Sequence, residues 1–447
     1  MDNIRLLTRA AVAILAALVC AAPASAQRPR PDRPYRGLFG GNGADPNSTQ
    51  QLDLNASLFG AYDDNVLANQ LQFGVDPRFQ QSGGYGTGTV SLDYTRRAGR
   101  ATFDFTGGTT YRYYPSLSQL DGANSFVSAG LTAKLSSRTN FSATESASYS
   151  PFYSLGAIPG MMTPSPGEIA PIGSDYPLLL ESALSLYSSA SLEHRLTPRA
   201  SLTADYTLQY TDYRTGNQVL DNWAAGGRFG YRLTSRASLR LGYHYRRSTS
   251  PLYFGGQPVV GHDIDVGIDY NRALSFSRKT TVGFTTGTSI YRSFTSNGSL
   301  ISTDWAYKTH FLATGSAYLN RQMGRSWTGR LSYQRGLQFV PGFGNPFFAD
   351  SVSASLGGFV GARSNLNLSA YYSSGQLGIV TTGQGYKSYV GAADYQFALS
   401  RFVALSANYT YYHYLFDPTV VLLPGMNRGL NRQSVRVCLN LWLPLLR

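Results

Sequence analysis

Apolar and polar residues alternate with a period of two along this chain, and this alternation constrains the fold more than any other feature. It is clearest within 199–247, where Trp223, Phe229 and Tyr231 share one phase and Arg228 lies on the other. Within the same stretch, residues 239–246 repeat the pattern, with Leu and Tyr on one phase and Arg and His on the other. Because successive side chains of a β-strand point to opposite faces, each run predicts a strand with one apolar face and one charged face.

In a soluble sheet, a second layer would cover the apolar face. Here the alternation recurs along nearly the whole chain, so we expect the apolar face to meet lipid and the charged face to line a lumen.

Two kinds of connection separate the runs. Short polar turns that carry Arg or Lys lie at 97–100, 136–138, 197–199, 234–236, 277–279, 323–325, 362–364 and 400–401. Longer irregular connections lie at 63–84, 114–124, 151–181, 214–221, 248–262, 292–306, 339–348, 375–385 and 417–431. Eight turns and nine loops join eighteen strands of about 10 to 14 residues, which is enough to cross a bilayer with tilt. The pattern predicts an all-β, antiparallel, up-and-down transmembrane barrel of about 18 strands, with short periplasmic turns and longer extracellular loops.

The chain divides into three predicted parts. Residues 1–26 have a basic start, an apolar core and the small-residue site Ala24-Ser25-Ala26, which is typical of a secretory signal peptide. Residues 27–50 are rich in Pro, Arg, Gly and Asn and predict a flexible lead. Within that lead, 35–40 is a candidate docking patch, although disorder is the favoured interpretation. Residues 51–447 form the predicted barrel.

The composition excludes several classes of protein. After the signal no apolar run is long enough for a membrane-spanning helix, and an aromatic content of 13% argues against disorder. The net charge of +13 is spread without basic blocks, so nucleic-acid binding is not expected. Cys438 would be the only cysteine after signal removal, which excludes an intrachain disulfide and a cysteine metal cluster. The histidines lack metal-ligand spacing, so we expect no metal and no cofactor.

The last strand, 433–445, alternates cleanly, and together with the signal and the even strand number it resembles bacterial outer-membrane β-barrels. More narrowly, the phrase Tyr62-Asp63-Asp64-Asn65 at the end of the first strand resembles the β-barrel porin 2 family, whose first strand often closes in Tyr-x-Asp-Asn. The resemblance covers the chain from about Gln51 onward. It implies a Gram-negative outer membrane with lipid and lipopolysaccharide around the barrel, and insertion by the barrel assembly machinery. Several members of that family accompany exopolysaccharide export systems, so polysaccharide export components are implied partners.

Charged and polar residues on the inward phase are the candidate pore-lining set. They are Asp53, Asp93, Asp104, Lys134, Glu193, Asp205, Arg228, Arg240, His244, Asp265, Asp269, Arg330, Asp394 and Arg436. Acidic residues dominate the first three strands, whereas 228–246 forms a basic wall on the eighth and ninth. Opposed walls would set up a field across the bore that orients dipolar or anionic solutes. The other interpretation is a ladder of ion pairs that fills or stiffens the interior, since barrel interiors are polar in either case.

One alternative to a channel is an enzyme. Glu145 falls on the outward phase in mid-strand, and Ser188 and His194 share that face of the next strand, so the three residues have the types that an acyl hydrolase uses. Outer-membrane hydrolases work at the loop end, however, whereas these residues lie nearer the short turns. We therefore expect no enzyme, with Glu145 at a local bulge and His194 at the periplasmic rim.

Two features of the periphery remain open. The loop 151–181 carries five prolines, and it either folds into the bore as a constriction or forms a rigid surface loop. Tyrosines near strand ends suit interfacial belts better than sugar stacking; they include Tyr62, Tyr111, Tyr210, Tyr245, Tyr291 and Tyr411. The function predicted overall is passive passage of small hydrophilic solutes or oligosaccharide, with a non-conducting accessory of exopolysaccharide export as the alternative.

Overall fold

The structure is a computed structural model. It describes residues 38–39, 49–65, 82–115, 121–151, 153–154, 177–179, 182–213, 218–249, 259–274, 277–296, 305–324, 326–338, 347–377, 385–418, 420 and 427–446. The signal peptide predicted at 1–26 and most of the lead lie outside this part of the chain, as does almost all of the loop at 151–181.

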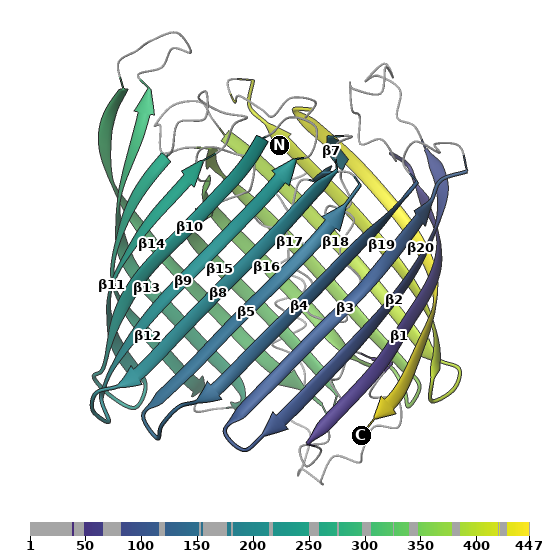
Figure 1. The fold of residues 1–447 in the computed structure, drawn as a ribbon, viewed down its shortest axis with the longest axis horizontal. Coiled ribbons are helices and arrows are strands. Elements are labelled where there is room, and N and C mark those ends of the chain that lie inside the picture. The colour runs from purple at the N-terminus through teal and green to yellow at the C-terminus, as the bar shows by residue number, and fades with distance from the viewer. Residues whose placement is uncertain are drawn as a thin grey trace.

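Eighteen strands form one sheet (Figure 1). They are β1 (Gln50–Asp63), β2 (Gly83–Ala98), β3 (Ala101–Tyr113), β4 (Gly122–Lys134), β5 (Thr139–Ser150), β8 (Ala183–Arg195), β9 (Ala200–Tyr213), β10 (Gln218–Arg232), β11 (Ala237–Thr249), β12 (Val259–Leu274), β13 (Ser277–Ser296), β14 (Trp305–Met323), β15 (Trp327–Gln338), β16 (Phe347–Phe359), β17 (Ser364–Leu377), β18 (Gly385–Ala398), β19 (Val403–Phe416) and β20 (Gly429–Leu446). The short β6 (Tyr153–Ser154) and β7 (Pro177–Leu179) pair with each other in a separate sheet.

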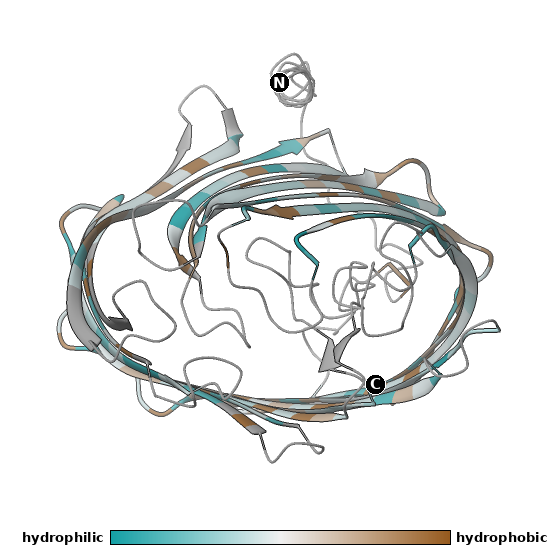
Figure 2. Cartoon of the chain, turned by 90° about the horizontal axis from the view of Figure 1, so that it is seen from above, coloured by the Kyte–Doolittle hydropathy of each residue, from teal (hydrophilic) through white to brown (hydrophobic). Residues whose placement is uncertain are grey.

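The sheet is a closed barrel. Each strand pairs antiparallel with the next, β5 pairs with β8, and β1 pairs with β20 along its length from Leu52 to Asp63. From above, the wall is a flattened ring (Figure 2). Closure leaves no edge that runs the full height of the wall, so the predicted up-and-down barrel of about 18 strands is confirmed.

A recurring hydroxyl turn explains the rhythm of the short connections. Thr197 accepts hydrogen bonds at its Oγ1 from the backbone N–H groups of Arg199 (3.2 Å) and Ala200 (2.9 Å). Thr234 holds Arg236 and Ala237 in the same way, at 3.1 and 3.0 Å. In these two turns the Thr hydroxyl accepts the hydrogen bonds of two backbone N–H groups that would otherwise need a partner on a neighbouring strand. The turn therefore ends one strand and starts the next.

Two other short turns need glycine. Gly99 and Gly324 have φ of 56° and 59°, in the left-handed region that residues with a Cβ rarely adopt. They lie between β2 and β3 and just after β14, within the turns predicted at 97–100 and 323–325. The turn predicted at 277–279 is wrong, because these residues belong to β13 and Leu274 pairs with Ser277. Strand β13 already begins at Ser277 and includes Arg278 and Lys279, and the ladder to β12 shifts register between Ala273 and Leu274.

The two faces of the wall differ in side-chain chemistry. On β20, Val435, Val437 and Leu439 face outward, and Val437 is 51% exposed, whereas the inward Arg436 is 3% exposed. Most of the exposed large apolar side chains of the other strands also lie on outward phases, among them Leu92, Leu241 and Val266. An oily outer surface on a closed antiparallel barrel of even strand number is the architecture of bacterial outer-membrane proteins, so the chain spans that membrane. Within the described residues, no helix has the length and apolar character needed to cross a bilayer.

One hairpin rises beyond its neighbours at the loop end. β13 and β14 pair up to Ser296 and Trp305, whereas β12 follows β13 only as far as Tyr291. On the other side, β14 is paired with β15 only from Gly315 to Met323. These two strands have 20 and 19 residues, longer than the predicted 10 to 14.

Candidate functional site: the lumen wall

All fourteen predicted pore-lining residues lie on the inward phase of their strands. The ladder pairs Asp53 with Asp93, and it places Asp205 and His244 on either side of Gly226. Asp394 and Arg436 both pair with Asn408 on β19, so they lie on the same face of the wall. The structure brings some of these residues together and keeps others apart.

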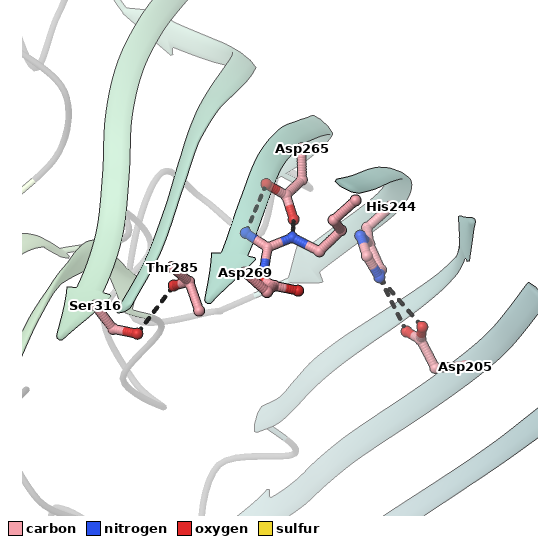
Figure 3. A network of polar contacts seen from close by, with 7 residues as sticks. Asp205, His244, Asp265, Asp269, Thr285 and Ser316 are labelled. Atoms are coloured by element: carbon pink, nitrogen blue, oxygen red, sulfur yellow. Dashed lines mark hydrogen bonds and ion pairs between the residues drawn. The ribbon is translucent and has the colours of Figure 1, made fainter. Parts of the chain in front are cut away.

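A polar network lies on β9, β11 and β12 (Figure 3). Arg240 contacts Asp265 from its Nε (2.6 Å) and Asp269 from its NH1 (2.5 Å). His244 Nε2 lies 3.2 Å from the carboxylate of Asp205. One guanidinium with two carboxylates carries a net charge of −1, so the wall is not basic at Arg240.

Glycines on the inward phase make room for this network. A Cβ at Gly226 would lie 2.2 Å from the His244 ring, and a Cβ at Gly267 would lie 3.0 Å from the Arg240 guanidinium. A Cβ at Gly287 would lie 2.8 Å from Asp265. Because these positions lack side chains, Arg240 and His244 lie along the wall and reach carboxylates on neighbouring strands. The glycines were the sequence signal for this network, and charge alone did not reveal it.

The predicted opposition of an acidic and a basic wall therefore needs correction. Asp93 accepts hydrogen bonds from Asn55 (2.6 Å) and Thr106 (2.7 Å) on the acidic side. On the basic side, Arg240 is neutralised, whereas Arg228 is exposed and makes no hydrogen bond or ion pair within the described residues. Among the described residues, cations exposed on the inward phase include Arg228, Arg330 and Lys134, on different strands.

Arg436 and Asp53 share the wall formed by β1 and β20, as predicted, but they do not meet. Arg436 pairs with Ala61 near the loop end, whereas Asp53 pairs with Pro444 near the turn end. Arg436 lies over the Phe59 ring at 5.5 Å, and Asp53 accepts a hydrogen bond from Gln51 at 2.5 Å. Both side chains are buried, so their contribution is to the wall rather than to the solute path.

The seam between the first and last strands carries an ion pair that was not predicted. Asp63 is fully buried, and its Oδ2 lies 2.7 Å from NH2 and 2.8 Å from Nε of Arg432, which is 2% exposed. The backbone N–H of Asn65 donates a hydrogen bond to Oδ1 of Asp63 (2.9 Å), and its side-chain amide donates one to the backbone carbonyl of Asn431 (3.0 Å). The residues of the Tyr62-Asp63-Asp64-Asn65 phrase thus fasten β1 to β20 at the loop end.

The inner wall is not polar all round. At the loop end of β16, β18 and β19, Phe347 packs against Tyr386 with ring centroids 5.0 Å apart, and Tyr386 lies 6.0 Å from Phe416. Ser373 and the Tyr386 hydroxyl are 2.8 Å apart. All four side chains are buried. Both phases of β19 carry aromatic residues, so the alternation that separates lumen from lipid is lost at that point.

Two residues of the N-terminal lead pack at the opposite end of this sector. Leu38 is buried against Ala398 and Ala404, and Phe39 lies 5.4 Å from the Phe359 ring. These partners lie on the inward phase where β16, β18 and β19 meet the short turns. The contact agrees with a docking patch for these two residues.

On the outer face, Glu145 and Ser188 are directly paired across β5 and β8, and Ser188 donates a hydrogen bond to the Glu145 carboxylate. His194 lies farther toward the turns, where its Nδ1 is 2.9 Å from the Thr139 hydroxyl. The predicted bulge at Glu145 is absent, because the described ladder of β5 and β8 is regular. Ser188 and His194 lie six residues apart on the same face of β8, with Leu192 between them, so they do not form a nucleophile and base pair.

We expect the double replacement Glu145→Leu with Ser188→Ala to raise the free energy of unfolding by about 1–2 kcal/mol, because a carboxylate at mid-strand on the lipid face is costly. Ser188 is changed as well so that its hydroxyl does not lose its acceptor. Urea unfolding in phospholipid vesicles measures the effect. Glu193→Leu, on the inward phase, is the matched control and should not stabilise; a loss of stability in the double variant would contradict the expectation.

Aromatic residues gather on the outer face near the loop end. Trp223 and Tyr245 have ring centroids 5.1 Å apart, and Tyr245 lies 5.3 Å from His262. The predicted belt residues Tyr62 and Tyr111 are outward and exposed. The side chain of Tyr291 lies outside the described residues. In the described part of the chain, no group of three or more His, Cys, Asp or Glu side chains could hold a metal ion.

The sequence matches no protein-family model and no curated protein. Among solved structures, the fold is similar to OccK2 (OpdF) of Pseudomonas aeruginosa in complex with glucuronate, at 12% identity and a TM-score of 0.46, over 89% of this chain and 98% of that one. It is also similar to Pseudomonas aeruginosa OpdK with vanillate, at 14% identity and a TM-score of 0.43, over 88% and 98% of the two chains. Likenesses at this level do not transfer a function.

Proposed function

We propose that the chain forms a channel for the passive passage of small hydrophilic solutes across the outer membrane. The observation that carries this proposal is a closed barrel with exposed polar side chains on its inward phase, among them Arg228, Ser142 and Thr144. Barrels of 16 to 18 strands are wide enough to leave an aqueous bore. Lipid and lipopolysaccharide would surround the outer face, and insertion would use the barrel assembly machinery.

The test is ion conductance of the purified, folded protein in a planar lipid bilayer. We expect stepwise increases in current, and liposome swelling with neutral solutes of increasing size gives the size limit of passage. The same protein kept unfolded in urea is the control and should give no steps. A folded protein that gives no steps would contradict the proposal and favour the non-conducting accessory of an exopolysaccharide export system.

A further inference from the structure

One sector of the inner wall has a chemistry unlike the rest. On β4, β5 and β8, the inward side chains are uncharged except at the turn end, where Lys134, Glu193 and Arg195 lie. Most carry hydroxyl or amide groups: Asn124, Ser128, Thr132, Asn140, Ser142, Thr144, Ser146, Ser148, Ser150, Ser185, Ser189 and Ser191. We call this sector the hydroxyl wall. It lies between the acidic strands and the network of Arg240.

Two exposed aromatic side chains interrupt the hydroxyl wall. Phe126 on β4 is 39% exposed and Tyr187 on β8 is 43% exposed, although both lie on the inward phase. Phe126 pairs with Ser148 and Tyr187 with Ser146, so the two aromatic residues lie on either side of β5, two residues apart along it. Strand geometry separates their Cα atoms by roughly 12 Å, about the length of two sugar units.

The ring of Phe126 lies close to the wall. A Cβ at Gly108, the residue paired with Phe126 on β3, would lie 3.0 Å from the Phe126 Cζ. The glycine therefore makes room for the ring to lie along the wall, where it can present a face to the bore. Elsewhere on the inner wall, Phe347 and Tyr386 are buried, so exposure distinguishes the pair on the hydroxyl wall from aromatic residues that pack.

The hydroxyl groups beside these rings are available. Ser142, Thr144 and Ser148 are exposed on the inward phase of β5, and none has a side-chain hydrogen bond within the described part of the chain. The charged groups of the neighbouring sector differ, because Arg240 and His244 are already bonded to carboxylates. A solute at the hydroxyl wall would therefore meet donors and acceptors without displacing an internal ion pair.

We propose that the hydroxyl wall is a binding track for neutral saccharides, with sugar rings stacked on Phe126 and Tyr187. A pyranose ring has an apolar C–H face that packs on an aromatic ring, and its hydroxyl groups both donate and accept, as Ser and Thr do. Free charges would favour ionic solutes, and the track has none between its ends. This inference rests on the proposed channel, because it names a class of solute for the same lumen.

The experiment uses the full-length protein in a planar bilayer and a linear neutral glucan of six glucose units as the probe. We expect the glucan to interrupt the ion current, and Phe126→Ala and Tyr187→Ala each to weaken this block by about two- to tenfold. Tyr206→Ala is the matched control, because Tyr206 on β9 is 41% exposed but lies on the outward phase. The glucan should block the current through this variant as strongly as through the unchanged protein. Circular dichroism and heat-dependent gel migration verify that each variant is folded.

The outcomes separate this inference from the channel itself. If the protein conducts but the glucan does not block, or blocks both aromatic variants as strongly as the unchanged protein, the saccharide track is wrong and the channel stands. Stronger block by an anionic oligosaccharide of the same length would also overturn a track for neutral sugars. If the protein does not conduct, the channel fails, and titration calorimetry of the same glucan with the folded protein and its Tyr187→Ala variant decides whether the track exists.

Discussion

Replacing Arg432 by Ala is expected to lower the free energy of unfolding by about 3–5 kcal/mol, because it leaves the carboxylate of Asp63 buried without its charge partner. Both side chains are almost completely excluded from solvent, at 2% and 0% exposure. Arg432 donates to the Asp63 carboxylate from two nitrogens, so its removal takes away both charge-assisted hydrogen bonds. Urea unfolding of the protein in phospholipid vesicles measures the loss.

The chain offers a matched control on the outer face. Arg335 and Asp350 form an ion pair at 3.2 Å in which both side chains are 44% exposed, and Arg335→Ala should cost less than about 1 kcal/mol. The double replacement Asp63→Leu with Arg432→Leu should recover most of the stability, because it leaves no buried charge. If Arg432→Ala costs no more than Arg335→Ala, the pair does not fasten the seam.

Replacing Arg240 by Gln is expected to raise the permeability of the channel to cations over anions by about fivefold. The change takes the group of Arg240, Asp265 and Asp269 from a net charge of −1 to −2 on the lumen wall. One unit charge at 4 Å is worth about 1 kcal/mol in water, which corresponds to that ratio. The reversal potential in a potassium chloride gradient reports it. The shift should shrink between 0.1 M and 1 M salt, where the screening length falls from about 10 Å to 3 Å.

A charge-restoring variant tests the cause. Arg240→Gln combined with Asp269→Asn returns the group to −1, and its selectivity should return close to that of the unchanged protein. Arg228→Gln removes a cation that is exposed and unpaired in the described structure, so it should shift selectivity without releasing a carboxylate and without loss of stability. Equal ion selectivity in Arg240→Gln and the unchanged protein would mean that the network does not face the ion path.

The fold was predictable because its determinants are local. The period of two assigns a face to every residue of a strand, and a Ser or Thr such as Thr197 ends a strand through its own backbone neighbours. These signals lie within a few residues of each other in sequence. They failed at 277–279, where charged residues continue β13, and they did not foresee the length of β13 and β14, because strands outside lipid need no alternation.

The contacts of the site were less predictable because they depend on register between distant strands. Arg240 reaches Asp265 and Asp269 only because β11 and β12 align it with Gly267, midway between the two carboxylates. Asp63 and Arg432 are separated by 369 residues in the sequence. Alternation placed Arg240 on the correct face but could not say which partner it would find, so the wall was predicted as basic when it is locally acidic.

The upper part of β14 limits how far the acyl chains can rise beside it. Above Gly315, the described structure gives β14 no strand partner on the β15 side, so the backbone N–H and C=O groups along that edge need partners other than a described strand. Such groups cannot remain in hydrocarbon, where nothing satisfies them, and they need contact with water or lipid headgroups. We therefore expect the boundary between the oily layer and the outer headgroups near the level of Gly315 on this side of the protein, which gives one reference point for the depth of the barrel in the membrane.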